Sequence, residues 1–405
     1  MISVEEAHKR ILDALTPTGR ETVPIGTAFG QVLAETVTAR RDQPPSDVSA
    51  MDGYACRAAD IADPPAALRI IDEIPAGALP ARAIGSGEAA RIFTGAAVPD
   101  GADSIVLQED TEREGETVRL SQPVEPFRHI RTRGGDFRAG QDGLASGTRL
   151  TARHIGLLAA MNIPWITVHR APRIGILATG NELVHPGEPV GPGQIVSANS
   201  HGLAAAVTAW GGVPVPLGIA PDDAEALDAV MRDAGRFDLL VTSGGASVGD
   251  HDLVQDALAN AGFSLDFWRI AMRPGKPLMF ATRGDTVALG LPGNPVSAMV
   301  CALLFLRPAL GRLAGADLPP LPELRLPCPV PLAANGKRAD YMRARVETRP
   351  DGERQVTPLK PQDSAMMRLL SEADALLVRP PEAPATQAGD PVTVVPLGES
   401  GAFSF

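Results

Sequence analysis

The sequence predicts a multidomain α/β protein: a parallel-sheet domain with a β-rich insertion, a discontinuous helical domain and a small C-terminal β-barrel. The chain has 405 residues, and at roughly 100 to 200 residues per domain this is too long for one compact core. From Pro172 onward, strands, glycine-containing loops and helices alternate, as in a parallel sheet covered by helices. From about residue 26 to 148, short β-branched runs and many Gly and Pro residues replace any long helical period.

The N-terminal segment predicts an amphipathic helix that begins with a capping box from Ser3 to Glu6. The apolar residues behind it at helical spacing are Val4, Ala7, Ile11, Leu12 and Leu15. A second helix is expected after Thr151 and should end before Pro164. We expect the two helices to pack together, which would make the β-rich residues between them an insertion.

The parallel-sheet domain is expected to carry buried strands at IGILAT, FDLLVTS and VALGL, because these runs are apolar throughout. The loops that follow these strands are TGNE, GGASVG and PGNP. Asn294 and Pro295 predict the start of a long apolar helix, as N-cap and first helical residue. A proline-rich linker then leads to alternating runs that predict a small β-barrel or sandwich.

Composition argues against several classes of function. The formal net charge is −11, which disfavours a broad nucleic-acid-binding face. The three cysteines form no CxxC pair, so a disulfide framework or cysteine-built zinc site is not expected and a cytoplasmic location fits. No apolar run reaches about 18 residues, so no membrane span is expected. HExxH and Walker lysine motifs are absent from the sequence.

Candidate functional residues follow the predicted strands, where ligands bind in open parallel sheets. The GGASVG turn could cradle a phosphate with its backbone amides, although such a turn is equally compatible with plain structure. Five carboxylates follow strands on the same rim and together indicate Mg²⁺, whereas each alone could be a solvated loop charge. They are Glu182, Asp222, Asp223, Asp250 and Asp252. Arg269, Arg273 and Lys276 add positive charge suited to an anion, and alone would indicate a surface loop.

Seven motifs in chain order resemble the molybdopterin molybdenumtransferase family, called MoeA in bacteria and present as one domain of gephyrin in animals. The motifs are SAMDGYA, RIFTGAAVPDGAD, RTRGGDFRAG, ILATGNELV, SGGASVGDHD, MRPGKPLMF and LPGNPVSA, and the resemblance covers roughly residues 3 to 398. It implies an elongated, L-shaped homodimer whose chains each have four domains. These are residues 1–26 with 148–172, the insertion 27–147, the molybdopterin-binding α/β domain 173–318 and the barrel 319–405.

The implied reaction takes adenylylated molybdopterin and molybdate as substrates, inserts the metal at the dithiolene and releases AMP in a Mg²⁺-dependent step. The resemblance implies Glu182, Asp222 and Asp252 as the metal residues, and these three with Asp52 and Thr94 as catalytic. Arg269 and Arg273 match positions that are usually lysine and would attract molybdate. The residues implied in substrate and phosphate binding are Arg131, Asp136, Thr179, Ser243, Gly244, Gly245, Ser247, Gly249, Lys276, Pro292, Gly293, Asn294, Pro295, Arg343 and Ser364.

The resemblance also carries expectations about partners. Asp52, Thr94, Arg131 and Asp136 would complete the cleft from the dimer mate, and a molybdopterin adenylyltransferase would act upstream. Asn181 stands where the family commonly has Asp, which removes one carboxylate from the metal site. Two alternatives stay open at this point: an adenylyltransferase-like enzyme, and a non-catalytic scaffold like gephyrin.

Overall fold

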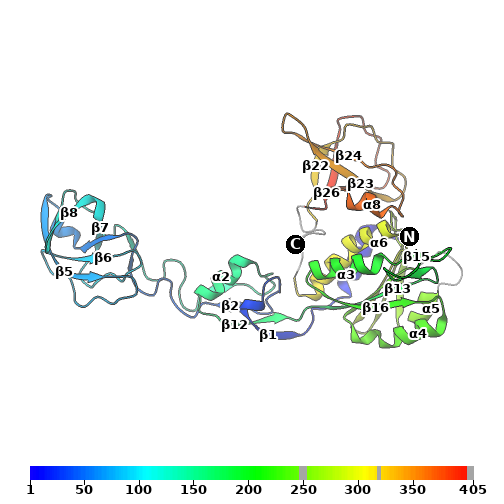
Figure 1. Cartoon of the computed structure of the whole chain (residues 1–405), viewed down its shortest axis with the longest axis horizontal. Coiled ribbons are helices and arrows are strands. Elements are labelled where there is room, and N and C mark those ends of the chain that lie inside the picture. The colour runs from blue at the N-terminus through cyan, green and yellow to red at the C-terminus, as the bar shows by residue number, and fades with distance from the viewer. Residues whose placement is uncertain (246–252, 317–320, 399–405) are drawn as a thin grey trace.

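The computed structural model describes residues 1–245, 253–316 and 321–398. Figure 1 shows four units along the chain: a far β module at one end, a connecting unit around α2, an α/β unit at the other end, and a C-terminal sheet beside the α/β unit. The fold is mixed α/β, as the sequence predicts.

The α/β unit is built on a six-stranded sheet with the order β16-β13-β17-β21-β20-β18. Its strands are β13 (Arg173–Thr179), β16 (Val213–Ala220), β17 (Leu239–Ser243), β18 (Ser264–Arg269), β20 (Pro277–Arg283) and β21 (Thr286–Leu291). The first four in the order run parallel, which confirms the predicted parallel core. Strand β20 runs antiparallel to both of its neighbours, so β18 points the same way as β21. The carboxyl ends of five strands therefore meet at one edge, where β20 begins.

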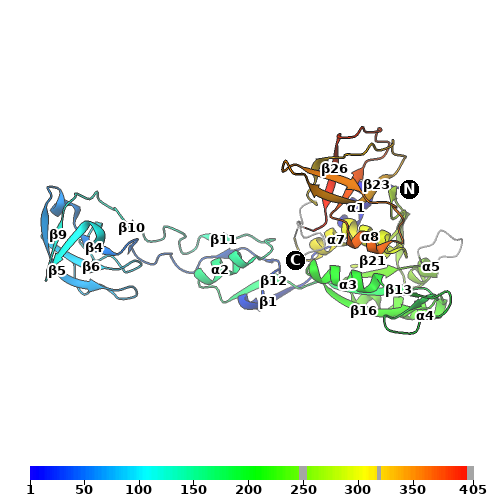
Figure 2. The same cartoon turned by 45° about the horizontal axis from the view of Figure 1, so that its top comes forward.

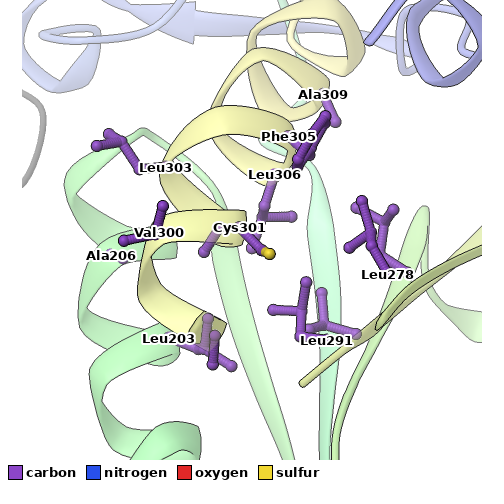
Figure 3. Close-up of a cluster of buried hydrophobic side chains, with 14 of the residues drawn as sticks. Leu203, Ala206, Leu278, Leu291, Val300, Cys301, Leu303, Phe305, Leu306 and Ala309 are labelled. Atoms are coloured by element: carbon purple, nitrogen blue, oxygen red, sulfur yellow. The ribbon is translucent and has the colours of Figure 1, made fainter. Parts of the chain in front are cut away.

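Helices cover both faces of this sheet. They are α3 (Asn199–Ala209), α4 (Ala224–Arg232), the 3₁₀ turn η4 (Asp233–Arg236), α5 (Leu253–Asn260), α6 (Pro295–Cys301), the π-helical segment η5 (Ala302–Leu306) and α7 (Arg307–Leu313). Alternate residues of a strand point to opposite faces, so Val241 packs in the core under α3 and α6, whereas Leu240 packs under α4 and α5. In Figure 3, Leu203 and Ala206 of α3 lie beside the helix that carries Cys301.

The run from α6 to α7 is apolar enough to have raised the question of a membrane. Among the described residues, Pro295–Leu313 is the helical stretch whose length and composition would suffice to cross one, but most of it (78%) is buried inside the protein. Cys301, Phe305 and Leu306 are fully buried and face the sheet residues Leu278 and Leu291 (Figure 3). The helix is thus the core helix of the α/β unit.

The first helix, α1 (Val4–Asp13), does not pack against α2, so that prediction was wrong. Its buried residues Ala7 and Ile11 join the α/β core, and α1 lies against α7 and η5 (Figure 2). The N-cap was predicted correctly, since the Glu6 N–H donates to Ser3 Oγ at 3.1 Å. The reciprocal half of the capping box is missing, because the Glu6 carboxylate accepts from Arg10 Nε at 2.7 Å instead.

The connecting unit joins distant parts of the chain through strand pairs. Strand β1 (Arg20–Pro24) pairs antiparallel with β12 (Trp165–His169), and β2 (Val37–Thr38) pairs antiparallel with β11 (Asp142–Leu144). The 3₁₀ turn η1 (Ile25–Thr27) and α2 (Ala152–Ala160) complete it. One hydrophobic cluster contains Leu33, Phe137 and Leu158 together. Leu33 and Phe137, which lie inside the predicted insertion 27–147, thus share a core with Leu158 of α2, and the predicted domain bounds stay a prediction.

The far module begins with the pair β3 (Val48–Ser49) and β10 (Ile130–Arg131). Its six-stranded sheet has the order β7-β4-β6-β5-β9-β8. The strands and 3₁₀ turns are β4 (Gly53–Cys56), η2 (Ala58–Ile61), β5 (Ala66–Ile74), β6 (Glu88–Ile92), β7 (Ser104–Leu107), η3 (Gln108–Asp110), β8 (Thr111–Glu114) and β9 (Thr117–Leu120). Buried clusters on both faces of this sheet give the module its own core.

The C-terminal unit is a sheet of order β19-β23-β25-β26-β22 with β24 beside β23. Its elements are β22 (Leu324–Pro327), β23 (Ala339–Thr348), β24 (Arg354–Pro358), α8 (Met367–Ser371), β25 (Ala375–Arg379) and β26 (Pro391–Pro396). Strand β19 (Met272–Arg273) comes from the α/β segment and pairs in parallel with β23. The loop between β18 and β20 is therefore shared by two units.

Candidate active site

The shared edge of the α/β sheet brings the predicted loops together. Thr179 ends β13, Ser243 ends β17 and Leu291 ends β21, and these three strands are neighbours in register. The loop after β16, which contains Asp222, lies beside the loop after β13, since Gly180 N–H donates to Ala220 O at 3.2 Å. Arg269 and Pro277 are paired at the same edge on the other side of β21.

The turn after β17 requires glycine at two positions. Gly244 has φ +101°, and a Cβ there would lie 2.3 Å from the carbonyl oxygen of Thr179. Gly245 has φ +67°, and its Cβ would lie 2.4 Å from Cγ2 of Val254 in α5. Residues that carry a side chain rarely adopt these φ angles, and their Cβ atoms would not fit here. The rest of the motif, with Ser247, Gly249, Asp250 and Asp252, lies outside the described residues, so their predicted roles stay predictions.

Two buried hydroxyls lie beneath this turn. Thr179 is 2% exposed and Thr242 is 1% exposed, and neither hydroxyl has a hydrogen-bond partner within the described ranges. A buried polar group left without a partner costs about 1 to 3 kcal/mol. Such strain is common at ligand sites, and the hydroxyl of Thr179 lies 2.9 Å from where a Cβ of Gly245 would stand. The hydroxyl of Thr179 thus lies directly against the glycine turn.

The loop after β21 starts helix α6 as predicted. Asn294 is the N-cap, Pro295 is the first helical residue, and Ala298 N–H donates to Asn294 O at 2.9 Å. Val296 N–H donates to the carbonyl of Ser364 at 3.0 Å. This bond brings the C-terminal segment that contains Ser364 beside the Pro292–Gly293 turn.

The acidic residues at the edge have different tasks. Glu182 and Asp222 are exposed, and no ion pair or hydrogen bond engages either carboxylate in the described part of the chain. The carboxylate of Glu182 folds back over Gly180, where a Cβ would lie 2.5 Å from one of its oxygens. Asp223 is instead the N-cap of α4, because its Oδ1 accepts from Ala226 N–H at 2.9 Å. The edge therefore offers two free carboxylates, and Asp223 serves structure.

The side chain of Asn181 links two loops at this edge. Its Oδ1 accepts the N–H of Asp222 at 3.0 Å and so ties the loops after β13 and β16 together. An aspartate oxygen could accept the same bond. No set of three or more His, Cys, Asp or Glu side chains is arranged to hold a metal ion within residues 1–245, 253–316 and 321–398. Glu182 and Asp222 are oxygen donors of the kind that Mg²⁺ uses when substrate phosphates and water supply its other ligands.

The two arginines of the β18–β20 loop differ in their freedom. Arg273 forms an ion pair with Asp340 of β23, a carboxylate that is only 5% exposed, and this hydrogen bond raises the pKa of Arg273. Arg269 stacks on the ring of Trp268, with its guanidinium carbon 3.5 Å from the ring centroid. Its Nε is buried and has no partner in the described residues. The charge of Arg269 therefore has no carboxylate partner in the described residues, whereas the charge of Arg273 is already balanced.

Arg343 lies behind the edge rather than on it. It is 1% exposed, and its guanidinium donates to the carbonyls of Met366 at 2.9 Å and Pro361 at 3.1 Å. Burial lowers its pKa. These bonds brace the segment that contains Ser364, so the described geometry gives Arg343 a supporting position and leaves its predicted contact with substrate a prediction.

The remaining predicted residues lie at the base of the far module. Asp52 Oδ1 accepts from the backbone N–H of Thr94 at 2.7 Å and from its hydroxyl at 2.8 Å. The two hydrogen bonds lower the pKa of Asp52, and the bond from the backbone N–H contributes the most. Arg131 is paired with Val48 in the β10–β3 ladder, and the exposed Asp136 is held in the adjoining connection by Gln43 O.

The far module and the α/β unit lie at opposite ends of the folded molecule (Figure 1). A single chain thus brings Asp52 together with Thr94, and the loop of Glu182 beside the loop of Asp222, but it does not bring these two places together.

One residue at the edge was missed in the sequence. The short parallel pair of β14 (Leu183–Val184) and β15 (Ile195–Val196) delivers the chain to α3. Asn199, the first residue of α3, donates from Nδ2 to Ser243 Oγ at 2.9 Å and to Gly293 O at 2.7 Å. Its only signal in the sequence was its place at a helix start.

Comparison with protein families covers nearly all of these units. Residues 2–162 match a model described as MoeA N-terminal region (domain I and II). Residues 175–312 match one described as a probable molybdopterin binding domain, and residues 325–397 match the MoeA C-terminal region (domain IV).

Curated proteins and solved structures agree with these matches. Over 404 residues the chain is 35% identical to molybdopterin molybdenumtransferase 2 of Mycobacterium tuberculosis, covering 97% of this chain and 99% of that protein. It is 40% identical over 303 residues to molybdopterin molybdenumtransferase of a Nostoc species, covering 73% and 70% of the two chains. A crystal structure titled molybdopterin biosynthesis moea protein from Pyrococcus horikosii superposes with a TM-score of 0.84 at 30% identity, over 98% of this chain and 99% of that one.

Proposed function

The chain belongs to the molybdopterin molybdenumtransferase family, and from this premise we propose how its active edge works. The active edge is the edge of the α/β sheet at which the parallel strands end. As a member it is a transferase that inserts molybdenum into molybdopterin. The finer proposal is that it takes adenylylated molybdopterin and molybdate as substrates, releases AMP and depends on Mg²⁺. The observation that carries it is the convergence of a glycine turn, two free carboxylates and unbalanced positive charge at one sheet edge.

The substrate's phosphates would lie against the turn after β17. Backbone N–H groups in a turn with positive φ can converge on an anion, and Gly244 and Gly245 both have positive φ. Thr179, whose hydroxyl is without a partner among the described residues, can donate from beneath the same turn. These donors would hold the phosphoanhydride in place and stabilise the charge that develops as AMP leaves.

Glu182 and Asp222 would hold the Mg²⁺. Bound there, the ion would neutralise phosphate charge. Asp252, which lies outside the described residues, is proposed as a third ligand from its motif alone. On the other side of the cleft, Arg269 and Lys276 would attract the molybdate dianion, because their charges are not balanced by a carboxylate in the described part of the chain.

We propose that a homodimer completes this site. Asp52 and Thr94 match motifs of the family cleft but lie at the far end of their own chain (Figure 1). A second copy could supply them to the α/β edge of the first. An L-shaped outline, closure of the C-terminal sheet into a barrel, a cytoplasmic location and delivery of substrate by a molybdopterin adenylyltransferase belong to the same proposal.

The test is to give purified protein adenylylated molybdopterin, Mg²⁺ and either molybdate or tungstate, and to measure AMP and active cofactor. We expect AMP release that requires molybdate and Mg²⁺ and that is lost in Asp252→Ala. ATP and molybdopterin are offered in a parallel reaction, and their consumption would instead indicate an adenylyltransferase. Absence of both reactions, from protein shown to bind the pterin, would indicate a scaffold and refute the proposal.

A further inference from the structure

Asn199 joins the two loops that form the phosphate end of the active edge. Its Nδ2 lies 2.7 Å from the carbonyl oxygen of Gly293 and 2.9 Å from Ser243 Oγ. A carbonyl oxygen can only accept a hydrogen bond, so the NH₂ group must face Gly293 and the orientation of the amide is determined. The same NH₂ group has a second hydrogen for Ser243.

The direct bonds between the two loops are weaker than those through Asn199. Gly244 N–H reaches Leu291 O at 3.3 Å, and Ser243 Oγ reaches Pro292 O at 3.5 Å. Both distances are at the long end of hydrogen-bond geometry, whereas the bonds through Asn199 are near the optimum. Gly293 has little packing to hold it, because among the described residues a Cβ there would meet only the Cα of Gly244, at 3.6 Å.

Asn199 lies at the start of a well-packed helix. It begins α3, an eleven-residue helix that packs against the sheet and α6, and Leu203 and Val207 of this helix are fully buried. Ser197 N–H, two residues earlier, donates to Val184 O at 2.9 Å. The amide can therefore impose its position on the glycine loops.

We propose that Asn199 is a positioning residue for phosphate binding, which holds the loop after β17 in register with the loop after β21. The inference rests on the proposed function, since it assumes that these loops receive the phosphates of the substrate. Asn199 would act through the hydroxyl of Ser243 and the backbone carbonyl of Gly293 and not on the reacting atoms.

The test is Asn199→Asp, which keeps the size of the side chain but removes both donated hydrogens and places a carboxylate against a carbonyl. We expect kcat for AMP release to fall at least about tenfold at pH 7.5, which corresponds to about 1.4 kcal/mol of lost transition-state stabilisation. Protonation of the new carboxyl returns one donor, so activity relative to wild type should rise as the pH is lowered from about 7.5 toward 5. Asn199→Ala has nothing to protonate and should show no such recovery.

Asn335→Asp is a matched control. Nδ2 of Asn335 also donates to backbone carbonyls, those of Arg338 at 2.8 Å and Arg379 at 3.0 Å, but in the C-terminal sheet. A merely structural role for Asn199 would make both Asp variants lose thermal stability and activity in the same proportion, with no recovery at low pH, and this result would overturn the proposal. Wild-type kcat and KM in Asn199→Asp would overturn it as well.

Binding of AMP separates failure of this inference from failure of the proposed function. Calorimetric titration with AMP needs no turnover, and we expect Asn199→Asp to bind it at least about fivefold more weakly than wild type, because two hydrogen bonds that shape the site are lost. Equal AMP affinities in the two proteins would overturn the positioning role even if the wild type inserts molybdenum. A wild type that binds AMP but does not release it from substrate would contradict the proposed reaction alone.

Discussion

Replacing Gly244 with alanine should damage the active edge much more than replacing Gly187 with alanine. Both glycines have left-handed backbone, with φ of +101° and +91°, and forcing another residue there costs about 1 to 2 kcal/mol. A Cβ at 187 meets nothing within 4 Å, whereas at 244 it would stand 2.3 Å from the carbonyl oxygen of Thr179. That overlap requires backbone movement, and overpacking of this kind costs about 1 to 3 kcal/mol more.

The assay is thermal unfolding of the two variants together with AMP release. At roughly 2 to 4 °C per kcal/mol for a unit of this size, the extra overlap should lower the unfolding midpoint of Gly244→Ala at least about 2 °C below that of Gly187→Ala. Because Thr179 and Gly244 belong to the proposed phosphate site, AMP release should also fall at least about tenfold, and Gly187→Ala should keep its activity. Equal midpoints and equal activities would refute the reasoning from close approach.

Three further outcomes are expected. Arg269→Met should raise KM for molybdate by about tenfold and Arg273→Met much less, because a buried carboxylate already balances Arg273; equal KM values in steady-state assays would contradict this. Hydrogen bonds from Thr94 lower the pKa of Asp52, so their contribution to stability is present above the ordinary aspartate pKa of about 3.9 and is lost as the pH falls further. Thr94→Val removes the hydroxyl bond but keeps the backbone bond, so it should reduce that acid dependence in part in a pH series of urea unfolding, and an unchanged slope would count against it. Ile11→Ala, which empties a site that is 1% exposed in the α/β core, should cost about 2 to 5 kcal/mol in urea unfolding, and a loss below about 1 kcal/mol would mean that α1 is not part of that core.

Periodicity in the sequence identified which residues are buried but not what covers them. The stripe with Ala7 and Ile11 predicted an amphipathic helix, and both residues are buried. The stripe does not indicate which surface the helix packs against. The predicted packing against α2 was therefore wrong, and the helix packs in the α/β core. Burial of an apolar face is non-directional, and any complementary surface satisfies it.

The antiparallel part of the main sheet has a local signal in the sequence, the turn between β20 and β21. Gly284 and Asp285 separate β20 from β21, and Arg283 pairs with Thr286 across them. A two-residue Gly-Asp turn between apolar runs is typical of a β-hairpin. Its effect on the site is direct, because the reversal brings the start of β20 to the edge where the parallel strands end.

Side-chain contacts between distant segments could not be predicted in the same way. Arg273 and Asp340 lie in different units, and their ion pair follows from the pairing of β19 with β23. Asn199 has no motif, since its function depends on two loops that close only in the folded sheet. By contrast Gly244 and Asn294 were predictable, because a turn with positive φ and a helix start each leave a local pattern.

Two segments of the chain, and not one, connect the far module to the rest of the protein. Strands β1 and β12 run side by side from the α/β unit into the connecting unit, paired over five residues from Arg20 opposite His169 to Pro24 opposite Trp165. A single covalent linker would let the module swivel about its bonds, whereas a hydrogen-bonded ribbon resists torsion. The paired strands therefore restrict the orientation of Asp52 relative to its own α/β unit. In the proposed homodimer, less rotational entropy would be lost on assembly, and the effective concentration of Asp52 at the partner's site would be higher.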